Sequence, residues 1–436
     1  MGTTAPRANG ELMISIEEAH NLIMASTEAL PACETALDDA LGLVLAADIV
    51  SRDAIPSFNN SAMDGYAVRA ADIADATPES PVNLSVVADV KAGDVANVPV
   101  KTGQAVRIMT GAPVPAGADA VIRVEDTMTE AGRERAAFER APAASDKLSP
   151  VLVLRSIPAG RNVRLAGEDV KPGEIVLAAG QTLGPADIGL LASLGFPKVP
   201  VYHRPRVAVI TTGDELLEID QPLEPGKIRN SNAYSLAAQI KQAGAIPVRY
   251  GIAADTPAAA RELFQKALAE CDVLLTTGGV SVGEYDYVKD VLADIGAAKV
   301  FWGVAQKPGK PLGYWNFKNR HIFGLPGNPV AAMVSFEEYV RPMLRRLMGQ
   351  RLLFRPAVTG TLVSSVRKRP GRVHIIRVHV DKKGAEYLVD STGPQGSGIL
   401  RSMVLADGLA FIPADAESMP AGSSVTVHLI TLPEDH

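Results

Sequence analysis

The chain has only two cysteines, Cys33 and Cys271, so it cannot build a disulfide framework, and their scarcity favours a reducing compartment. Since none of the seven histidines falls in an H-x-x-x-H pair, the usual zinc ligand sets are excluded as well. No stretch approaches the roughly 18 apolar residues of a membrane helix, and the first residues lack the features of a secretory signal. We therefore expect a cytoplasmic protein that does not associate with membranes.

An excess of positive charge is also missing, because the formal net charge is −6. Nucleic-acid binders need clustered positive charge to displace counterions from phosphates, so we expect no nucleic-acid partner. Neither a Walker A motif nor a G-x-G-x-x-G fingerprint is present. One local exception is the stretch from Tyr339 to Val380, which lacks aspartate and glutamate and could attract a small oxyanion.

The first half of the chain mixes helical and β-rich segments. A chain of 436 residues, 47% of them hydrophobic, is long enough for about three to four domains. A helix is expected after Ser15, which suits an N-cap, and another over Glu34–Leu41. Short β-rich runs begin at Ala47, residues 128–149 are expected to form a loop or hairpin tip, and a further helix is expected over Pro185–Leu194.

From Arg206 the pattern becomes an alternation of apolar strands and amphipathic helices. This alternation predicts a parallel sheet with helices on both faces. Residues 352–436 return to short strands, which are typical of a small barrel or sandwich. The helices expected in the α/β region cover 234–243, a segment starting at Thr256, 287–295 and 329–347.

Unusual loops follow four strands of the α/β region: Thr212–Glu215, Gly278–Asp286, Lys307–Pro311 and Gly327–Pro329. In an open parallel sheet the carboxyl ends of the strands meet at one edge, and ligands bind there. Any one of these loops alone is more often a plain turn. Their joint placement after successive strands predicts a single site.

The residue types in these loops favour a phosphorylated ligand with a metal ion. Glycines let the backbone approach an anion, and helix N-termini add positive potential. Lys307 and Lys310 flank a Pro-Gly turn and could hold negative groups. Asp214, Glu215 and Asp286 offer the oxygen ligands that Mg²⁺ prefers when it bridges phosphates.

One competing interpretation is a serine hydrolase. Residues 279–283 fit the G-x-S-x-G nucleophile elbow, and His321 or His374 could then serve as the base. We disfavour this reading because no HGGG-type oxyanion loop is present and only about five strands precede the change of architecture.

A second constellation lies earlier, in the segments Pro56–Ala67 and Met109–Ala120. Both are rich in small and turn-forming residues, so a structural loop is the default interpretation of either alone. Asp64 and Thr110 are the residues in them that could take part in chemistry.

Taken in order, several motifs resemble the molybdopterin molybdenumtransferases, the MoeA-like proteins that are related to the E domain of gephyrin. The matching stretches run over nearly the whole chain and are PSFNNSAMDGYAVR, MTGAPVPAGADAVIRVED, RLAGEDV, ITTGDEL, TTGGVSVGEYDYV, KPGKP and GLPGNPV. The resemblance implies an Mg²⁺-dependent transferase of molybdenum cofactor biosynthesis. Such an enzyme inserts molybdenum from molybdate into adenylylated molybdopterin and releases AMP.

The resemblance also implies four domains, a doubly wound MogA/MoaB-like α/β domain among them, and a homodimer with a shared active site. A discontinuous helical and β domain would cover 11–50 and 150–204, a β-rich insert 51–149, the α/β domain 205–348, and a C-terminal β-barrel 349–436. A MogA-like adenylyltransferase and molybdoenzyme acceptors would be further partners. A non-catalytic scaffold of the gephyrin type and a molybdopterin adenylyltransferase stay open as alternatives.

Site residues carried over from the family fall in both constellations. Asp64 and Thr110 would enter from the partner subunit and act with Glu215 and Asp286 in catalysis. Asp214, Glu215 and Asp286 would hold the metal. The substrate would be bound by Thr212, Gly213, Asp214, Gly278, Gly279, Ser281, Pro326, Gly327, Asn328, Pro329, Lys307, Lys310, Arg377 and Ser397.

Three positions depart from the family pattern. Gly303 stands where some relatives carry lysine, Ala331 where many carry serine, and Asn59 where aspartate is frequent. Two of these changes remove a lysine and a hydroxyl near the expected molybdate path.

Overall fold

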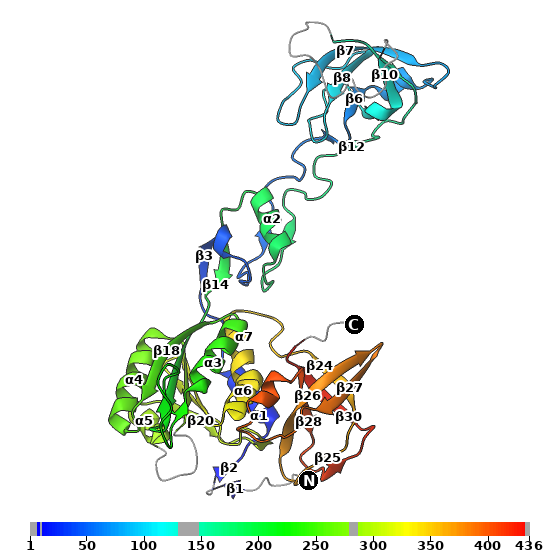
Figure 1. Ribbon diagram of the computed structural model, residues 1–436. Helices are drawn as coiled ribbons and strands as arrows, with labels where there is room; N and C mark the ends of the chain where they lie inside the picture. Colours follow the sequence, from blue (N-terminus) through cyan, green and yellow to red (C-terminus); the bar gives the residue numbers. More distant parts are fainter. Residues whose placement is uncertain (1–6, 9–10, 130–147, 279–286, 432–436) are drawn as a thin grey trace. The chain divides into compact units, whose positions relative to one another are not determined.

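The computed structural model describes residues 7–8, 11–129, 148–278 and 287–431 (Figure 1). The chain forms two compact units. The first comprises Met1–Ala47, Ala179–Ile188 and Pro197–His436, and the second comprises Asp48–Ala178 and Gly189–Phe196. Among the described residues, no helix combines the length and the hydrophobicity that crossing a membrane requires.

A six-stranded sheet forms the centre of the first unit. Its strands lie in the order β18 (Ile246–Ala253), β15 (Arg206–Thr212), β19 (Val273–Thr277), β23 (Arg320–Leu325), β22 (Gly313–Phe317) and β20 (Ala298–Trp302). The first four are parallel, as predicted, but β22 is antiparallel to both neighbours. The predicted parallel arrangement therefore holds for β18, β15, β19 and β23 but not for β22. Lys318 and Asn319 close the β22–β23 hairpin with φ of 46° and 62°, the left-handed pair that a tight turn needs.

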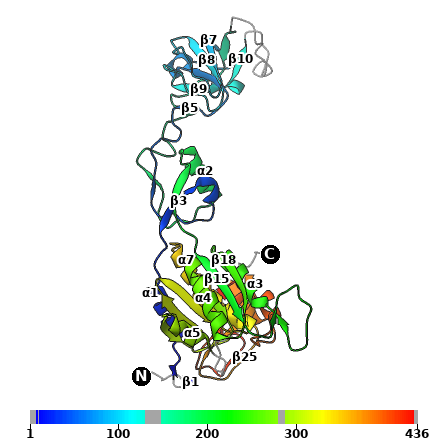
Figure 2. The same cartoon turned by 90° about the vertical axis from the view of Figure 1, so that its left-hand side faces the viewer.

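Helices cover both faces of this sheet, as expected from the alternation (Figures 1 and 2). Along β15, Val207 and Val209 enter one core, whereas Ala208 and Ile210 enter the other. The first core also receives α1 (Ile16–Ala25), α3 (Ser231–Gln242), α6 (Pro329–Ser335) and α7 (Arg341–Leu347). The second receives α4 (Pro257–Glu270) and α5 (Val288–Asp294).

Helix ends follow the sequence signals in most cases. The side chains of Ser15 and Thr256 accept the amides of Glu18 and Ala259 at 3.0 and 3.3 Å, so the predicted N-caps are confirmed. Gly244 and Gly296 terminate α3 and α5 with φ of 96° and 86°.

One helix prediction was wrong. The segment predicted as a helix over Glu34–Leu41 is strand β3 (Ala32–Ala36) followed by a short 3₁₀ turn (Leu37–Asp39), because β3 pairs antiparallel with β14 (Lys198–Tyr202). A distant strand therefore overrides a weak local preference. The helix predicted over 329–347 is confirmed, because α6, a π-helical turn at Phe336–Val340 and α7 follow one another without a break.

The C-terminal part of the first unit is a small closed barrel. Strands β26 (Val373–Lys383), β27 (Glu386–Ser391), β24 (Ala357–Leu362), β30 (Ser424–Leu429) and β28 (Gly408–Ile412) pair in this order, and β28 pairs back with β26. Strand β21 (Gln306–Lys307) pairs in parallel with the start of β26. Helix α8 (Arg401–Val404) precedes β28. Small accessory pairs are β25 (Val366–Arg367) with β29 (Ser418–Met419) and β1 (Arg7–Ala8) with β2 (Glu11–Leu12).

The second unit contains a six-stranded sheet of its own. The order is β10 (Thr127–Thr129), β11 (Val151–Val153), β7 (Val82–Val90), β8 (Gln104–Ile108), β6 (Gly65–Val68) and β9 (Ala120–Arg123). Two-stranded pairs join β4 (Ile49–Val50) to β13 (Ile175–Leu177) and β5 (Asn60–Ser61) to β12 (Val163–Arg164). Helix α2 (Pro185–Ser193) lies where a helix was predicted. Most of the predicted loop at 128–149 lies outside the described residues.

The π-helical turn carries two buried glutamates that tie the helices to the barrel. Glu337 is 4% exposed and accepts bonds from Arg355 Nε at 2.9 Å and Gln239 Nε2 at 2.8 Å. Glu338 is 2% exposed and contacts Nδ1 of His428 on β30 at 3.1 Å. The two carboxylates therefore link α3, the segment after α7 and the barrel.

A buried histidine in the sheet makes the stability of the fold depend on pH. Nδ1 of His321 lies 2.7 Å from the Tyr314 hydroxyl, and desolvation lowers the pKa of His321 from 6.5 to about 4, although Asp272 opposes this. The unfolded chain binds this proton more tightly, so the stabilisation is complete above pH 6.5 and is lost as the pH falls toward 4. The shift corresponds to about 3 kcal/mol.

We expect His321→Asn, which keeps a polar atom near Nδ1 but cannot titrate, to flatten the fall in thermal unfolding midpoint between pH 7 and pH 5. Part of the fall should remain, because burial also lowers the pKa of His20. His379→Asn, at a half-exposed position, is the control and should leave the slope unchanged. An identical slope in wild type and His321→Asn would contradict the assignment.

Candidate functional site

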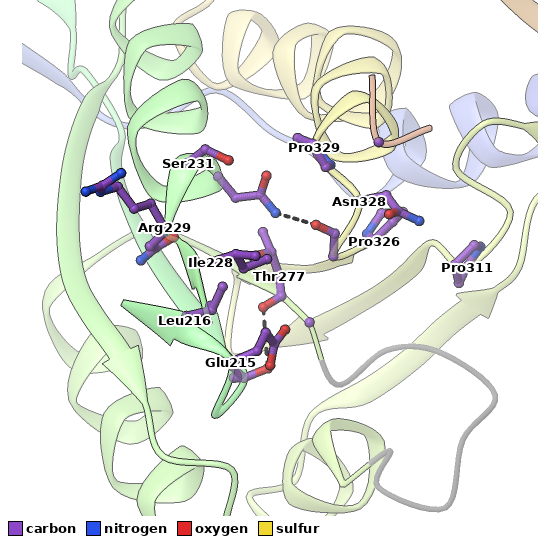
Figure 3. A pocket seen from close by; sticks show the side chains of 16 residues that line it. Glu215, Leu216, Ile228, Arg229, Ser231, Thr277, Pro311, Pro326, Asn328 and Pro329 are labelled. Carbon is purple, nitrogen blue, oxygen red and sulfur yellow. Dashed lines mark hydrogen bonds between the residues drawn. The ribbon is translucent and has the colours of Figure 1, made fainter. Parts of the chain in front are cut away.

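The predicted edge of the central sheet carries a cavity of about 610 Å³ (Figure 3). Loops after β15, β19 and β23 contribute to it, which confirms that they meet at one edge of the sheet and line a common cavity. Its volume is typical of a pocket for a small organic ligand. The lining residues are Thr212, Glu215, Leu216, Ile228, Arg229, Asn230, Ser231, Asn232, Thr277, Gly278, Pro311, Pro326, Gly327, Asn328, Pro329 and Gly398.

The floor of the cavity is made where β15 and β19 end side by side. Thr212 is 3% exposed, and its hydroxyl donates to the carbonyl of Thr277 at 3.4 Å. Gly278 follows with φ of 88°, and a Cβ on it would lie 2.3 Å from the Thr212 carbonyl oxygen. The ends of β15 and β19 approach so closely here that only glycine fits. The backbone of the floor is therefore open to a ligand.

One wall is formed by β16 (Leu216–Leu217) and β17 (Ile228–Arg229), two short strands that pair in parallel. The amide of Ile228 donates to the Glu215 carbonyl at 2.8 Å, and Arg229 Nε donates to the carbonyl of Ile219 at 3.1 Å. Leu216 and Ile228 present apolar side chains to the cavity (Figure 3).

The acidic residues of the first loop face different surroundings. Glu215 lines the cavity, and its carboxylate lies so close to Gly213 that a Cβ there would be 2.4 Å from Oε2. Oδ1 of Asp214 instead accepts the amide of Asp255 at 3.3 Å, and Asp214 is not among the lining residues. Within the described ranges, no group of three or more His, Cys, Asp or Glu side chains is arranged to hold a metal ion.

Positive charge gathers near the Lys307–Pro311 loop. Lys307 lies opposite His374 in the register of the β21–β26 strand pair. Burial lowers the pKa of His374 to about 4, together with the charges of Lys307, Lys368 and Arg372. Pro311 reaches the cavity, whereas Lys307 and Lys310 are not among its lining residues.

Arg377 on strand β26 of the barrel holds the loop that contains Ser397. Arg377 is 1% exposed, and its guanidinium donates to Ser402 Oγ at 3.0 Å and to the carbonyl of Gly396 at 3.2 Å. The carbonyl of Ser397 accepts the amide of Val330 in α6 at 3.1 Å. Arg377 thus fixes the loop that brings Gly398 to the cavity; a direct contact of Arg377 or Ser397 with substrate stays a prediction.

In the second unit, the two predicted residues contact one another. Oδ1 of Asp64 accepts both the amide and the hydroxyl of Thr110 at 2.7 Å. These two bonds lower the pKa of Asp64, the backbone bond contributing most. Gly279, Ser281 and Asp286, and with them the G-x-S-x-G segment, lie outside the described residues.

The sequence alone did not identify the wall formed by the β16–β17 pair and the start of α3. Its unrecognised members are Leu216, Ile228, Arg229, Asn230, Ser231 and Asn232. The run R-N-S-N before an amphipathic helix was the available signal, because Asn and Ser favour helix starts and a helix start at this edge faces the site.

Comparison with protein families accounts for almost the whole chain. Residues 14–195 match the MoeA N-terminal region (domain I and II), 208–346 match the probable molybdopterin binding domain, and 359–430 match the MoeA C-terminal region (domain IV). A solved structure of the molybdopterin biosynthesis moeA protein from Pyrococcus horikoshii OT3 is 32% identical, with a TM-score of 0.75 over 96% of this chain and 100% of that chain.

Curated relatives give the same result. Molybdopterin molybdenumtransferase 2 of Mycobacterium tuberculosis is 38% identical over 96% of this chain and 100% of its own length. Molybdopterin molybdenumtransferase of Bacillus subtilis is 35% identical over 91% of this chain and 89% of its own length. The chain therefore belongs to the molybdopterin molybdenumtransferases, the MoeA family.

Proposed function

We propose that this chain inserts molybdenum from molybdate into adenylylated molybdopterin and releases AMP. As a member of its family it is a transferase of molybdenum cofactor biosynthesis. The observation that carries the finer proposal is the cavity at the strand ends, where backbone, polar and apolar groups converge on a space that suits a small ligand. Loops that the sequence predicts to bind phosphate line this space together.

Both substrates are anionic, so the site must offset their mutual repulsion. The first turn of α3 supplies amides that lack partners within the helix, and it adds positive potential at the cavity. Lys307, Lys368 and Arg372 add positive charge around the strand β21. In this proposal catalysis consists chiefly of positioning and electrostatic stabilisation.

A Mg²⁺ ion fits this site only if substrate provides most of its ligands. Mg²⁺ keeps several waters and binds through one or two carboxylates together with substrate phosphates. Glu215, which lines the cavity, suits this role, whereas the Asp214 carboxylate is bonded to the Asp255 amide. Mg²⁺ would supply neutralisation of phosphate charge.

Asp64 and Thr110 would complete the site from the partner subunit of a homodimer. Their mutual bonds hold the Asp64 carboxylate ionised and in one orientation. An ionised, fixed carboxylate is suited to orient a water or a substrate group. We place this dimer in the cytoplasm, in keeping with the scarcity of cysteine.

The test is AMP release from adenylylated molybdopterin, measured with and without molybdate and Mg²⁺. We expect AMP release to require both molybdate and Mg²⁺. Glu215→Gln should lower kcat about 100-fold, because a neutral amide then replaces the negatively charged carboxylate in the cavity. Asp220→Asn, which changes an exposed carboxylate in the connection between β16 and β17, is the matched control and should keep full activity.

Mixing the variants tests the shared site. If Asp64→Asn and Glu215→Gln are each inactive, equal mixtures should regain about a quarter of the wild-type activity, because half of the dimers then hold one intact site. Binding without AMP release in the unaltered chain would favour the scaffold, and ATP-dependent pyrophosphate release would favour the adenylyltransferase.

A further inference from the structure

Asn232, the second residue of α3, presents a side-chain amide to the cavity. It is 9% exposed and lines the cavity together with Gly327. Its Nδ2 donates to the carbonyl of Gly327 at 2.8 Å. Since a carbonyl only accepts, this bond fixes which end of the amide is nitrogen and which is oxygen.

The other end of this amide is buried and has no partner among the described residues. Oδ1 of Asn232 is shielded from solvent and accepts no hydrogen bond there. A buried acceptor without a donor is costly, and in a native protein it calls for an explanation. In the wall of a ligand cavity, the explanation is a donor that arrives with the ligand.

Asn232 is not needed to begin the helix. The N-cap is Asn230, whose Oδ1 accepts the Ala233 amide at 3.3 Å and whose Nδ2 donates to Thr211 Oγ1 at 2.8 Å. Both ends of the Asn230 amide are therefore used within the fold, unlike those of Asn232.

We propose that Oδ1 of Asn232 accepts an N–H of the exocyclic amino group on a heterocyclic ring of the substrate and so selects amino-bearing rings. This inference rests on the proposed function, whose substrate carries two such rings, a pterin and an adenine, each with an exocyclic amino group. The neighbouring side chains of Leu216 and Ile228 offer apolar surface to a flat ring (Figure 3). Asn232 is thus a specificity-determining residue.

Two pairs of ligands test this in the full-length protein. AMP is compared with inosine monophosphate, and pterin with lumazine, because each pair differs by replacement of an amino group by an oxo group. Calorimetric titration should show that the unaltered chain binds the amino member of one pair about tenfold more tightly. The pair that shows this preference identifies the ring at Asn232.

Variants separate recognition from structure. Asn232→Leu should bring that affinity ratio close to one, whereas Asn232→Asp, which keeps an acceptor but loses the donor to Gly327, should retain the preference. Asn316→Leu is the control, because Oδ1 of Asn316 is also buried without a described partner but does not line the cavity. Its ratio should equal that of the wild type.

The inference would be overturned if Asn232→Leu still preferred the amino ligand over the oxo ligand. It would also be overturned if the leucine and aspartate variants lost this preference equally. AMP release by a wild type that shows no preference in either pair would overturn it while leaving the proposed function intact. Failure of all four ligands to bind, together with no AMP release, would overturn both.

Discussion

Gly278→Ala is expected to lower the free energy of unfolding by about 3 kcal/mol and to abolish substrate binding. The added methyl group would lie 2.3 Å from the Thr212 carbonyl oxygen and 2.8 Å from its hydroxyl, both in the centre of the sheet edge. The carbonyl oxygen, a backbone atom, cannot withdraw without parting β15 from β19. The left-handed conformation of Gly278 costs an alanine about 1 kcal/mol, and the overlap adds about 1–3 kcal/mol.

Gly296→Ala provides the matched control for this prediction. Its φ of 86° is nearly that of Gly278, yet a Cβ there meets nothing closer than Phe317 at 4.0 Å. It should therefore lose only the conformational part, about 1 kcal/mol. Chemical denaturation of both variants and titration with AMP measure the difference, and equal losses of stability would show that the close approach of the strands is not the cause.

Glu337→Ala is expected to destabilise the first unit by about 3–5 kcal/mol, the range found when one partner of a buried ion pair is removed. The change leaves Arg355, whose exposed side-chain fraction is 14%, without its carboxylate, and it removes the acceptor of Gln239. Burial, and after it the charge of Arg355, lower the pKa of nearby Arg341 to about 10. A second uncompensated guanidinium would add to that cost.

Asp381→Ala is the comparison for Glu337→Ala. Asp381 lies 3.6 Å from Lys383, but both side chains are about two-thirds exposed, at 66% and 67%. Exposed pairs contribute about 0–1 kcal/mol, so denaturation should hardly detect this change. A loss below about 1 kcal/mol for Glu337→Ala would mean that water or side-chain rearrangement compensates the arginines.

Much of the fold was predictable because the local signals agree with the tertiary arrangement. Thr256 with Pro257 begins α4, and Gly244 ends α3, as their residue types require. The shared edge of β15, β19 and β23 follows from the rule for parallel strands, and it led to the cavity through Thr212, Gly278 and the Pro326–Pro329 segment.

The failures arise where distant partners decide the structure. Strand β22 requires a hairpin of Lys318 and Asn319, and lysine gives no signal for a left-handed turn. Asn232 could not be recognised as a cavity residue from the sequence. Only the fold shows that its Nδ2 has a hydrogen-bond partner and that its Oδ1 has none among the described residues. Gly303, where some relatives carry lysine, has φ of 85° and so suits glycine locally, which the sequence alone does not reveal.

The pairing of β3 with β14 has a consequence for synthesis of the chain. Cys33 meets Val201 in this pair, and nearly all of the second unit is made between the two. Ribosomes add about 5–20 residues per second. Strand β3 therefore stays unpaired for several seconds or longer, and the intervening unit can fold during this time. The cost of closing such a loop rises by only about 0.6 kcal/mol per doubling of its length. The strand pair can therefore accept insertions and deletions in the intervening unit during evolution with little loss of its own stability.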